Sequence, residues 1–123
     1  MVLAARRTRA AIALWFRRTR HVLAQGVALA LLIGGVADVA STNLALSTNL
    51  AVEANPLVAW VQAHAGAFWI VPKLAVHLGL ALFVVFSPRP SVIALMGAVA
   101  ALVFLAAGNN FAIYLEIQAA LAA

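Results

Sequence analysis

Three long apolar segments dominate this chain of 123 residues and restrict it to a lipid environment. They run at about residues 22–46, 67–86 and 91–117, and a helix needs about 20 apolar residues to cross a bilayer. The rest of the chain cannot cover a water-soluble core, because 67% of all residues are hydrophobic and only 9% are charged. The sequence therefore predicts an all-α integral membrane protein with three transmembrane helices.

The first connection, residues 47–66, contains the start signal of a short helix. Asn55 is a preferred N-cap residue, and Pro56 follows at the first helical position, where a missing N–H costs nothing. Gly66 is a plausible stop. We therefore expect a short helix over residues 56–65.

Prolines mark the second connection, and the third apolar segment stands out by its length. The sequence SPRPS at residues 87–91 contains two prolines and predicts a tight turn. The third segment is longer than a span requires. Either its end emerges into water or its helix breaks at Gly108-Asn109-Asn110.

Basic residues are concentrated at the N-terminus, where the motif RRTR occurs at residues 6–9 and again at 17–20. This offset of eleven residues is close to three helical turns, so both motifs lie on nearly the same face. We expect residues 1–21 to form a basic amphipathic helix at the membrane surface and residues 22–123 to form one membrane domain. The arginines expected to bind anionic lipid headgroups are Arg6, Arg7, Arg9, Arg17, Arg18 and Arg20.

The same arginines also act as a topology signal. Counting Lys and Arg in short loops places the N-terminus and Arg89 in the cytoplasm, with the first connection and the C-terminus outside. A secretion signal, cleaved after the sequence GGVA before Asp38, is an alternative. After such a cleavage the remainder would still be a membrane protein.

Polar residues interrupt all three spans at similar depth. Asp38 lies past the middle of an outgoing helix, Lys73 one or two turns into a returning one, and Asn109 about 27 Å along the third at about 1.5 Å per residue. Such groups are costly in lipid and tend to face one another. We expect an outward-facing cluster of Asp38 and Lys73 with hydrogen bonds from Ser41, Thr42 and Asn109. The full set of candidate residues is Asp38, Ser41, Thr42, Glu53, Asn55, Pro56, Lys73, His77, Asn109 and Asn110.

This cluster has two interpretations. Asp38 and Lys73 could neutralise each other and fix the helix register, or they could form a site for a proton, a cation or a polar ligand. Glu53 is either a solvated charge beside a helix cap or a further partner of Lys73.

The chain lacks the residues that several classes of functional site require. The chain has no cysteine, which excludes disulfides, thiolate catalysis and Cys-based metal sites. It has no Gly-rich phosphate loop, no convincing Ser-His-Asp set and no basic patch interleaved with aromatic residues for nucleic acid. A metal site would depend on His77, Asp38 and Glu53, without a His-x-x-x-His pair. We predict no metal, no cofactor, no catalytic residue and no nucleic-acid partner, and an enzyme of lipid or cell-envelope chemistry stays the less favoured possibility.

Small residues recur at helical spacing in the pairs Ala30–Gly34 and Gly97–Ala101. Such pairs let helices approach closely in lipid. Because a chain this short offers little internal contact area, we expect a homo-oligomer or a subunit of a larger membrane complex. The favoured function is a scaffold or accessory subunit, and the alternative is a protein that binds or transfers a proton, cation or polar ligand through Asp38 and Lys73.

The order of these residues resembles a family of small bacterial and archaeal membrane proteins with a domain of unknown function. The pattern is D-x-x-S-T in the first span, E-x-N-P in the connection and a lysine in the next span. It covers about residues 34–86, without the basic arm or the third span. The resemblance implies a helical membrane fold and no particular activity. It also implies that the matching residues are important: Asp38, Ser41, Thr42, Glu53, Asn55, Pro56 and Lys73.

Overall fold

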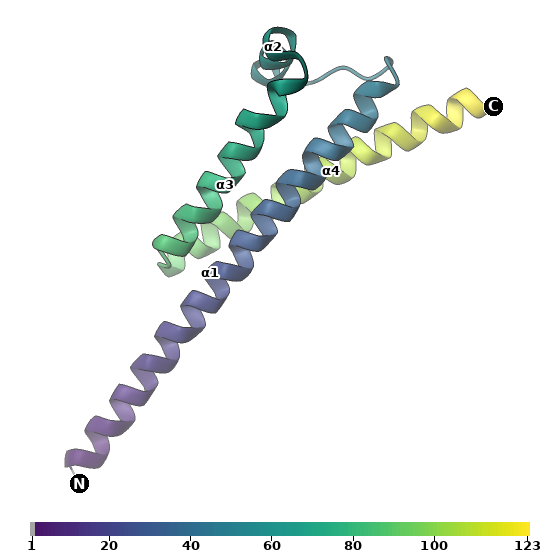
Figure 1. The fold of residues 1–123 in the computed structure, drawn as a ribbon. Coiled ribbons are helices and arrows are strands. Elements are labelled where there is room, and N and C mark those ends of the chain that lie inside the picture. The colour runs from purple at the N-terminus through teal and green to yellow at the C-terminus, as the bar shows by residue number, and fades with distance from the viewer. Residues whose placement is uncertain (1) are drawn as a thin grey trace.

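The computed structural model describes the backbone of residues 2–123 and the side chains of Ile12 and residues 14–123. The described chain is helical without strands (Figure 1). Its elements are α1 (Val2–Ser47), α2 (Pro56–Ala65), the 3-10 turn η1 (Gly66–Trp69), α3 (Ile70–Phe86) and α4 (Pro90–Ala122). Three helical stretches within the described residues are long and apolar enough to cross a membrane, at Leu14–Ser47, Pro56–Phe86 and Pro90–Ala122. The prediction of an all-helical chain with three helices long and apolar enough to span a membrane is confirmed.

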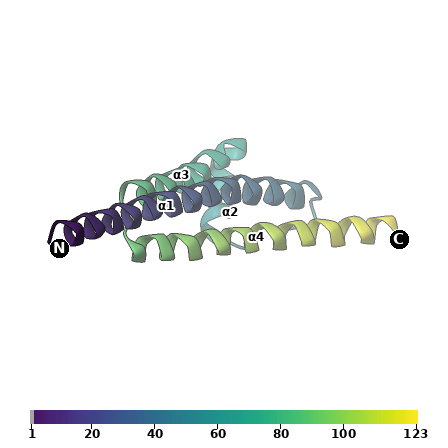
Figure 2. The same cartoon turned by 90° about the horizontal axis from the view of Figure 1, so that it is seen from below.

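α1 is the central element of the fold. It lies between α3 and α4 and contacts both with its C-terminal part (Figures 1 and 2). The side of α1 that faces them carries small and branched apolar residues at helical spacing, and the fully buried Leu31 and Val84 lie in the core that they form. The core residues are Ala24, Ala28, Leu31, Ala81, Val84, Met96 and Ala100.

Both long helices are continuous where the sequence suggested boundaries. α1 runs without a break through residues 21–22, so the basic segment and the first span share one helix. Its N-terminal part extends alone past the α3–α4 turn (Figure 1). No proline interrupts α1, and its alanine, leucine and arginine residues all favour helix. α4 likewise passes through Gly108-Asn109-Asn110 without a break, which leaves the other expectation, a helix that extends beyond the span.

The short helix α2 begins and ends where its sequence dictates. The Asn55 side chain accepts hydrogen bonds from the N–H groups of Leu57 and Val58 at 3.0 and 3.4 Å, and Pro56 occupies the first helical position. Gly66 ends the helix with a φ of 53°, a conformation that glycine adopts at no steric cost. α2 therefore covers residues 56–65, the predicted range, and it lies across the end of α3 rather than in line with it (Figure 1).

The surfaces that point away from the core are strongly apolar. Leu29, Val36, Phe83 and Leu105 are each at least half exposed, and similar side chains occur along all three spans. In water such a surface would be a large unfavourable area, whereas acyl chains accommodate it. These faces are suited to contact with lipid.

Candidate functional site

The charged centre of the molecule is a single ion pair between α1 and α3. Lys73 Nζ lies 2.8 Å from Asp38 Oδ2, and the two side chains are 17% and 12% exposed. The residues meet because α1 and α3 run antiparallel, so that the second half of α1 lies beside the first turn of α3. The predicted pairing of Asp38 and Lys73 is present, and it is the one ion pair among the described side chains.

The third span joins this pair through Asn110. Its Nδ2 donates to Asp38 Oδ1 at 3.2 Å and to Thr42 Oγ1 at 2.9 Å. The sequence prediction assigned this role to Asn109, which is instead exposed. Consecutive residues on a helix point about 100° apart, so depth along α4 could not distinguish the two amides. Asp38, Thr42, Lys73 and Asn110 form what we call the polar network.

The hydroxyl groups on α1 have a different role from the predicted one. Ser41 Oγ and Thr42 Oγ1 both donate to the backbone carbonyl of Asp38, at 3.1 and 2.7 Å. This bonding to the preceding turn is the usual way for Ser and Thr to satisfy their protons in an apolar helix. The hydroxyls therefore do not donate to the Asp38 carboxylate, and Thr42 enters the network as an acceptor for Asn110.

Two aromatic rings contact Lys73, the Trp69 ring of η1 at its ammonium and the His77 ring of α3 at its backbone carbonyl. The Lys73 ammonium lies 5.2 Å from the centroid of the buried Trp69 ring, within the range of a cation–π contact. His77 Nδ1 lies 2.8 Å from the Lys73 carbonyl oxygen. Because a carbonyl only accepts, Nδ1 donates a proton in this contact.

Cavities lie on both sides of the polar network. A cavity of about 320 Å³ separates α2 from α3, has mostly apolar walls, and reaches Asn55, Lys73 and His77. A smaller one of about 110 Å³ is lined by Thr42, Glu53, Asn109 and Asn110, among others. Residues of the network thus line two separate, partly open cavities.

Glu53 lines the smaller cavity with Thr42 and Asn110, and it does not line the cavity that reaches Lys73. Its Oε1 accepts a hydrogen bond from the Asn55 N–H at 2.9 Å, which strengthens the start of α2. The possible link from Glu53 to Lys73 is absent from the described contacts, whereas the interpretation as a charge beside a helix cap fits the geometry. The described residues contain no group of three His, Asp or Glu side chains arranged for a metal ion.

The basic residues of α1 lie far from this network. Arg17, Arg18 and Arg20 are exposed. The side chains of Arg6, Arg7 and Arg9 lie outside those that the structure describes, and their predicted role in membrane binding stays a prediction.

One protein family matches this chain, over residues 29–116, and its description is a domain of unknown function, DUF5658. The match covers well over half of the chain. The chain belongs to the DUF5658 family. The DUF5658 segment includes the whole polar network and most of α4, and so extends past the range 34–86 that the sequence resemblance covered. No curated protein and no solved structure matches the chain.

Within the DUF5658 segment, sequence reasoning missed a close helix contact at Gly35. A Cβ built on Gly35 would lie 2.6 Å from His77 Cγ, so this position accepts no side chain without displacing the ring. The neighbouring Gly34 faces α4, where a Cβ would lie 3.2 Å from Val103 Cγ1. The glycine pair thus lets α1 approach α3 with one residue and α4 with the next. The sequence feature that could have indicated this close contact is the pair of adjacent glycines in an apolar helix.

Proposed function

We propose that this protein is a small membrane scaffold or accessory subunit whose three spans are fixed in register by the polar network. The observation that best supports this proposal is that Asp38 contacts both other spans, through Lys73 at 2.8 Å and Asn110 at 3.2 Å. Both carboxylate oxygens therefore have partners inside the chain. A network with its polar atoms paired stabilises one arrangement of helices, because every alternative register leaves a charge in lipid.

The proposed orientation follows from the distribution of charge. The N-terminal part of α1 and the α3–α4 turn, whose sequences carry the arginines, lie toward one end of the molecule, and α2 with the C-terminal part of α1 lies toward the other (Figure 1). Since positive charge is retained on the cytoplasmic side, we place the arginine end and the N-terminus in the cytoplasm of a bacterium or archaeon. The network and the C-terminus then face outward, and the arginine arm of α1 contacts anionic lipid headgroups.

Assembly with other chains would use surfaces other than the small-residue pairs. Gly34 contacts Val103 and Phe104, and a Cβ at Gly97 would meet Val27, so both positions face the chain's own helices. The partly exposed faces of α3 and α4, with side chains such as Phe83 and Leu105, are left for a second copy or a larger membrane complex.

A second candidate function is binding of a proton, a cation or a small polar ligand at the network. The observation that favours this function is the cavity of about 320 Å³, which is lined by Lys73 of the polar network and by His77. His77 lines this cavity, and its Nε2 is the ring nitrogen that is not bonded to the Lys73 carbonyl.

One double variant separates the two functions. In Asp38→Leu/Lys73→Leu both charges disappear together, so the scaffold proposal expects the protein to fold and to complement a deletion strain as the parent does. The ligand proposal expects a folded protein that fails to complement. Co-purification of the same membrane partners by parent and double variant would support the scaffold directly, and loss of complementation by a folded double variant would refute it.

A further inference from the structure

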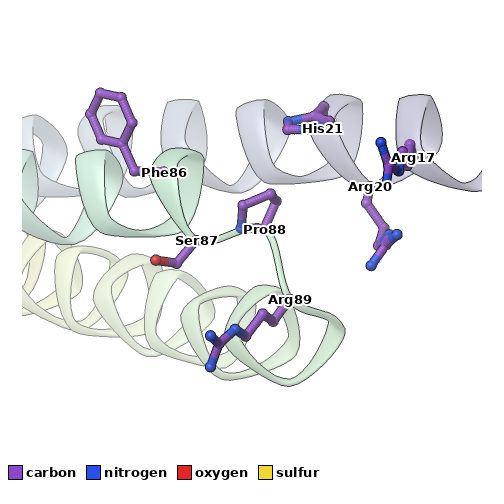
Figure 3. Close-up of a pocket in the computed structure, with 7 residues that line it drawn as sticks. All are labelled: Arg17, Arg20, His21, Phe86, Ser87, Pro88 and Arg89. Carbon is purple, nitrogen blue, oxygen red and sulfur yellow. The ribbon is translucent and has the colours of Figure 1, made fainter.

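A second polar site lies at the opposite end of the molecule from the network. There α1 and the α3–α4 turn enclose a cavity of about 360 Å³ (Figure 3). α1 contributes Arg17, Arg20 and His21, and the turn contributes Ser87 and Arg89. We call these five residues the basic pocket. Residues that are about 70 positions apart in sequence are thus brought to one cavity by the return of the chain after α3.

The positive charge of the basic pocket has no protein counter-charge. The chain has three acidic residues, Asp38, Glu53 and Glu116, and none lines the pocket. Asp38, the acid nearest to Arg20 along α1, is about 27 Å away at about 1.5 Å per residue. This separation exceeds the screening length of about 8 Å at physiological salt. The pocket therefore repels cations and attracts an anion.

The turn side of the pocket is conformationally fixed. The Ser87 N–H donates to the Phe83 carbonyl at 2.9 Å, and the Arg89 N–H donates to the Ser87 carbonyl at 2.7 Å. Pro88 and Pro90 restrict the remaining backbone torsions. Because the backbone that carries Arg89 is already ordered, the entropy cost of binding a ligand is confined to its side chain, which points away from Arg20 in Figure 3 and must turn toward a shared ligand.

The depth of the pocket indicates the source of the anion. Trp15 is exposed on α1 two residues before Arg17, and Phe86 lines the pocket where α3 ends. Tryptophan side chains at the ends of spans lie at the level of the lipid headgroups. At that level the abundant anions are lipid phosphates, and an arginine guanidinium can bind a phosphate through two parallel hydrogen bonds.

We propose that the basic pocket binds the headgroup phosphate of one anionic lipid, with Arg20 and Arg89 as the principal ligands from α1 and from the turn. Ser87 adds a hydroxyl donor and Arg17 and His21 complete the wall. This site is independent of the function proposed for the polar network. It also differs from a diffuse basic surface on the N-terminal arm, because it requires Arg89.

The test is a titration of short-chain phosphatidylglycerol into the full-length protein in a non-ionic detergent at constant salt. Arg89→Gln and Arg20→Gln are compared with Arg18→Gln, which removes the same charge from the same exposed arm but does not line the pocket. We expect the Kd to rise about tenfold in each pocket variant, as for loss of a charged hydrogen bond. Arg18→Gln removes one of several arginines from the diffuse headgroup contact of the arm and leaves the pocket intact, so we expect less than about a twofold rise, because that contact is screened by salt and shared with the remaining arginines.

Equal weakening by Arg18→Gln and Arg89→Gln, or no saturable binding by the parent, would overturn the proposal. Two further titrations use phosphatidylcholine and inorganic phosphate. Both should bind at least about tenfold more weakly than phosphatidylglycerol. Inorganic phosphate that binds as tightly and displaces the lipid would refute the lipid source. Unchanged thermal unfolding of Arg89→Gln shows that its weaker binding reflects the pocket rather than misfolding.

Discussion

Asp38 and Lys73 form a 2.8 Å ion pair at one end of the helices, whereas Arg17, Arg20 and Arg89 line a cavity without a carboxylate at the other. The first site is buried among three spans, where an unpaired charge would be very costly. The second is at the ends of the spans, where water and lipid phosphates can neutralise charge. Charge that is paired inside the chain therefore serves the fold, and charge left unpaired at the surface is available to a partner.

The largest effect on stability is expected when one charge of the buried Asp38–Lys73 pair is removed, and this tests whether paired charge serves the fold. Asp38→Leu leaves the Lys73 ammonium without its partner, and we expect it to lower the free energy of unfolding by about 3–5 kcal/mol. Denaturant unfolding in mixed micelles measures this change. Asp38→Leu/Lys73→Leu should recover most of the loss, and Glu53→Gln is the control for removal of a charge outside the pair. A loss below about 1 kcal/mol would mean that water already solvates the pair.

The close approach of α1 and α3 gives the next largest effect. In Gly35→Ala the new methyl group would meet the His77 ring, and overpacking of this kind costs about 1–3 kcal/mol. The same unfolding assay applies. Gly26→Ala is the matched control, since a Cβ there has no neighbour within 4 Å and alanine favours helix by about 1 kcal/mol. Similar effects of both substitutions would contradict the described helix contact.

The third helix can be tested with two adjacent amides. Asn110→Leu removes the hydrogen bonds to Asp38 and Thr42, and we expect a loss of roughly 1–2 kcal/mol, near the upper range for hydrogen bonds between membrane helices. Asn109→Leu should cost less than about 0.5 kcal/mol because Asn109 is exposed. If Asn109→Leu lowered thermal stability more than Asn110→Leu, the face of α4 that carries Asn109 would have to lie against the network.

The smallest effect on stability is expected at the basic pocket. Arg89→Gln removes a charge that has no ion-pair partner, so we expect the free energy of unfolding to change by less than about 0.5 kcal/mol. A loss of more than about 1 kcal/mol in lipid-free detergent would show that Arg89 serves the fold. The distinction between the two ends of the molecule would then fail.

Local sequence was sufficient for features that depend on neighbouring residues or on distance along a helix. The bounds of α2 follow from Asn55, Pro56 and Gly66, because capping is decided within a few residues. The pairing of Asp38 with Lys73 followed from depth, because antiparallel spans of similar length bring residues at the same depth together. No such rule exists for the angle around a helix axis. For this reason the sequence analysis, which had both amides among its candidates, assigned to Asn109 the hydrogen bond that Asn110 makes.

The sequence by itself determined a three-span helical membrane protein, its turns, and a buried pair of opposite charges. The tertiary structure alone decided that α1 lies between α3 and α4, that Gly35 admits the His77 ring, and that Arg89 shares a pocket with Arg17 and Arg20. The physical reason is that hydropathy and helix propensity act along one chain segment. Rotation of one helix against another is set by side-chain packing between residues that are distant in sequence.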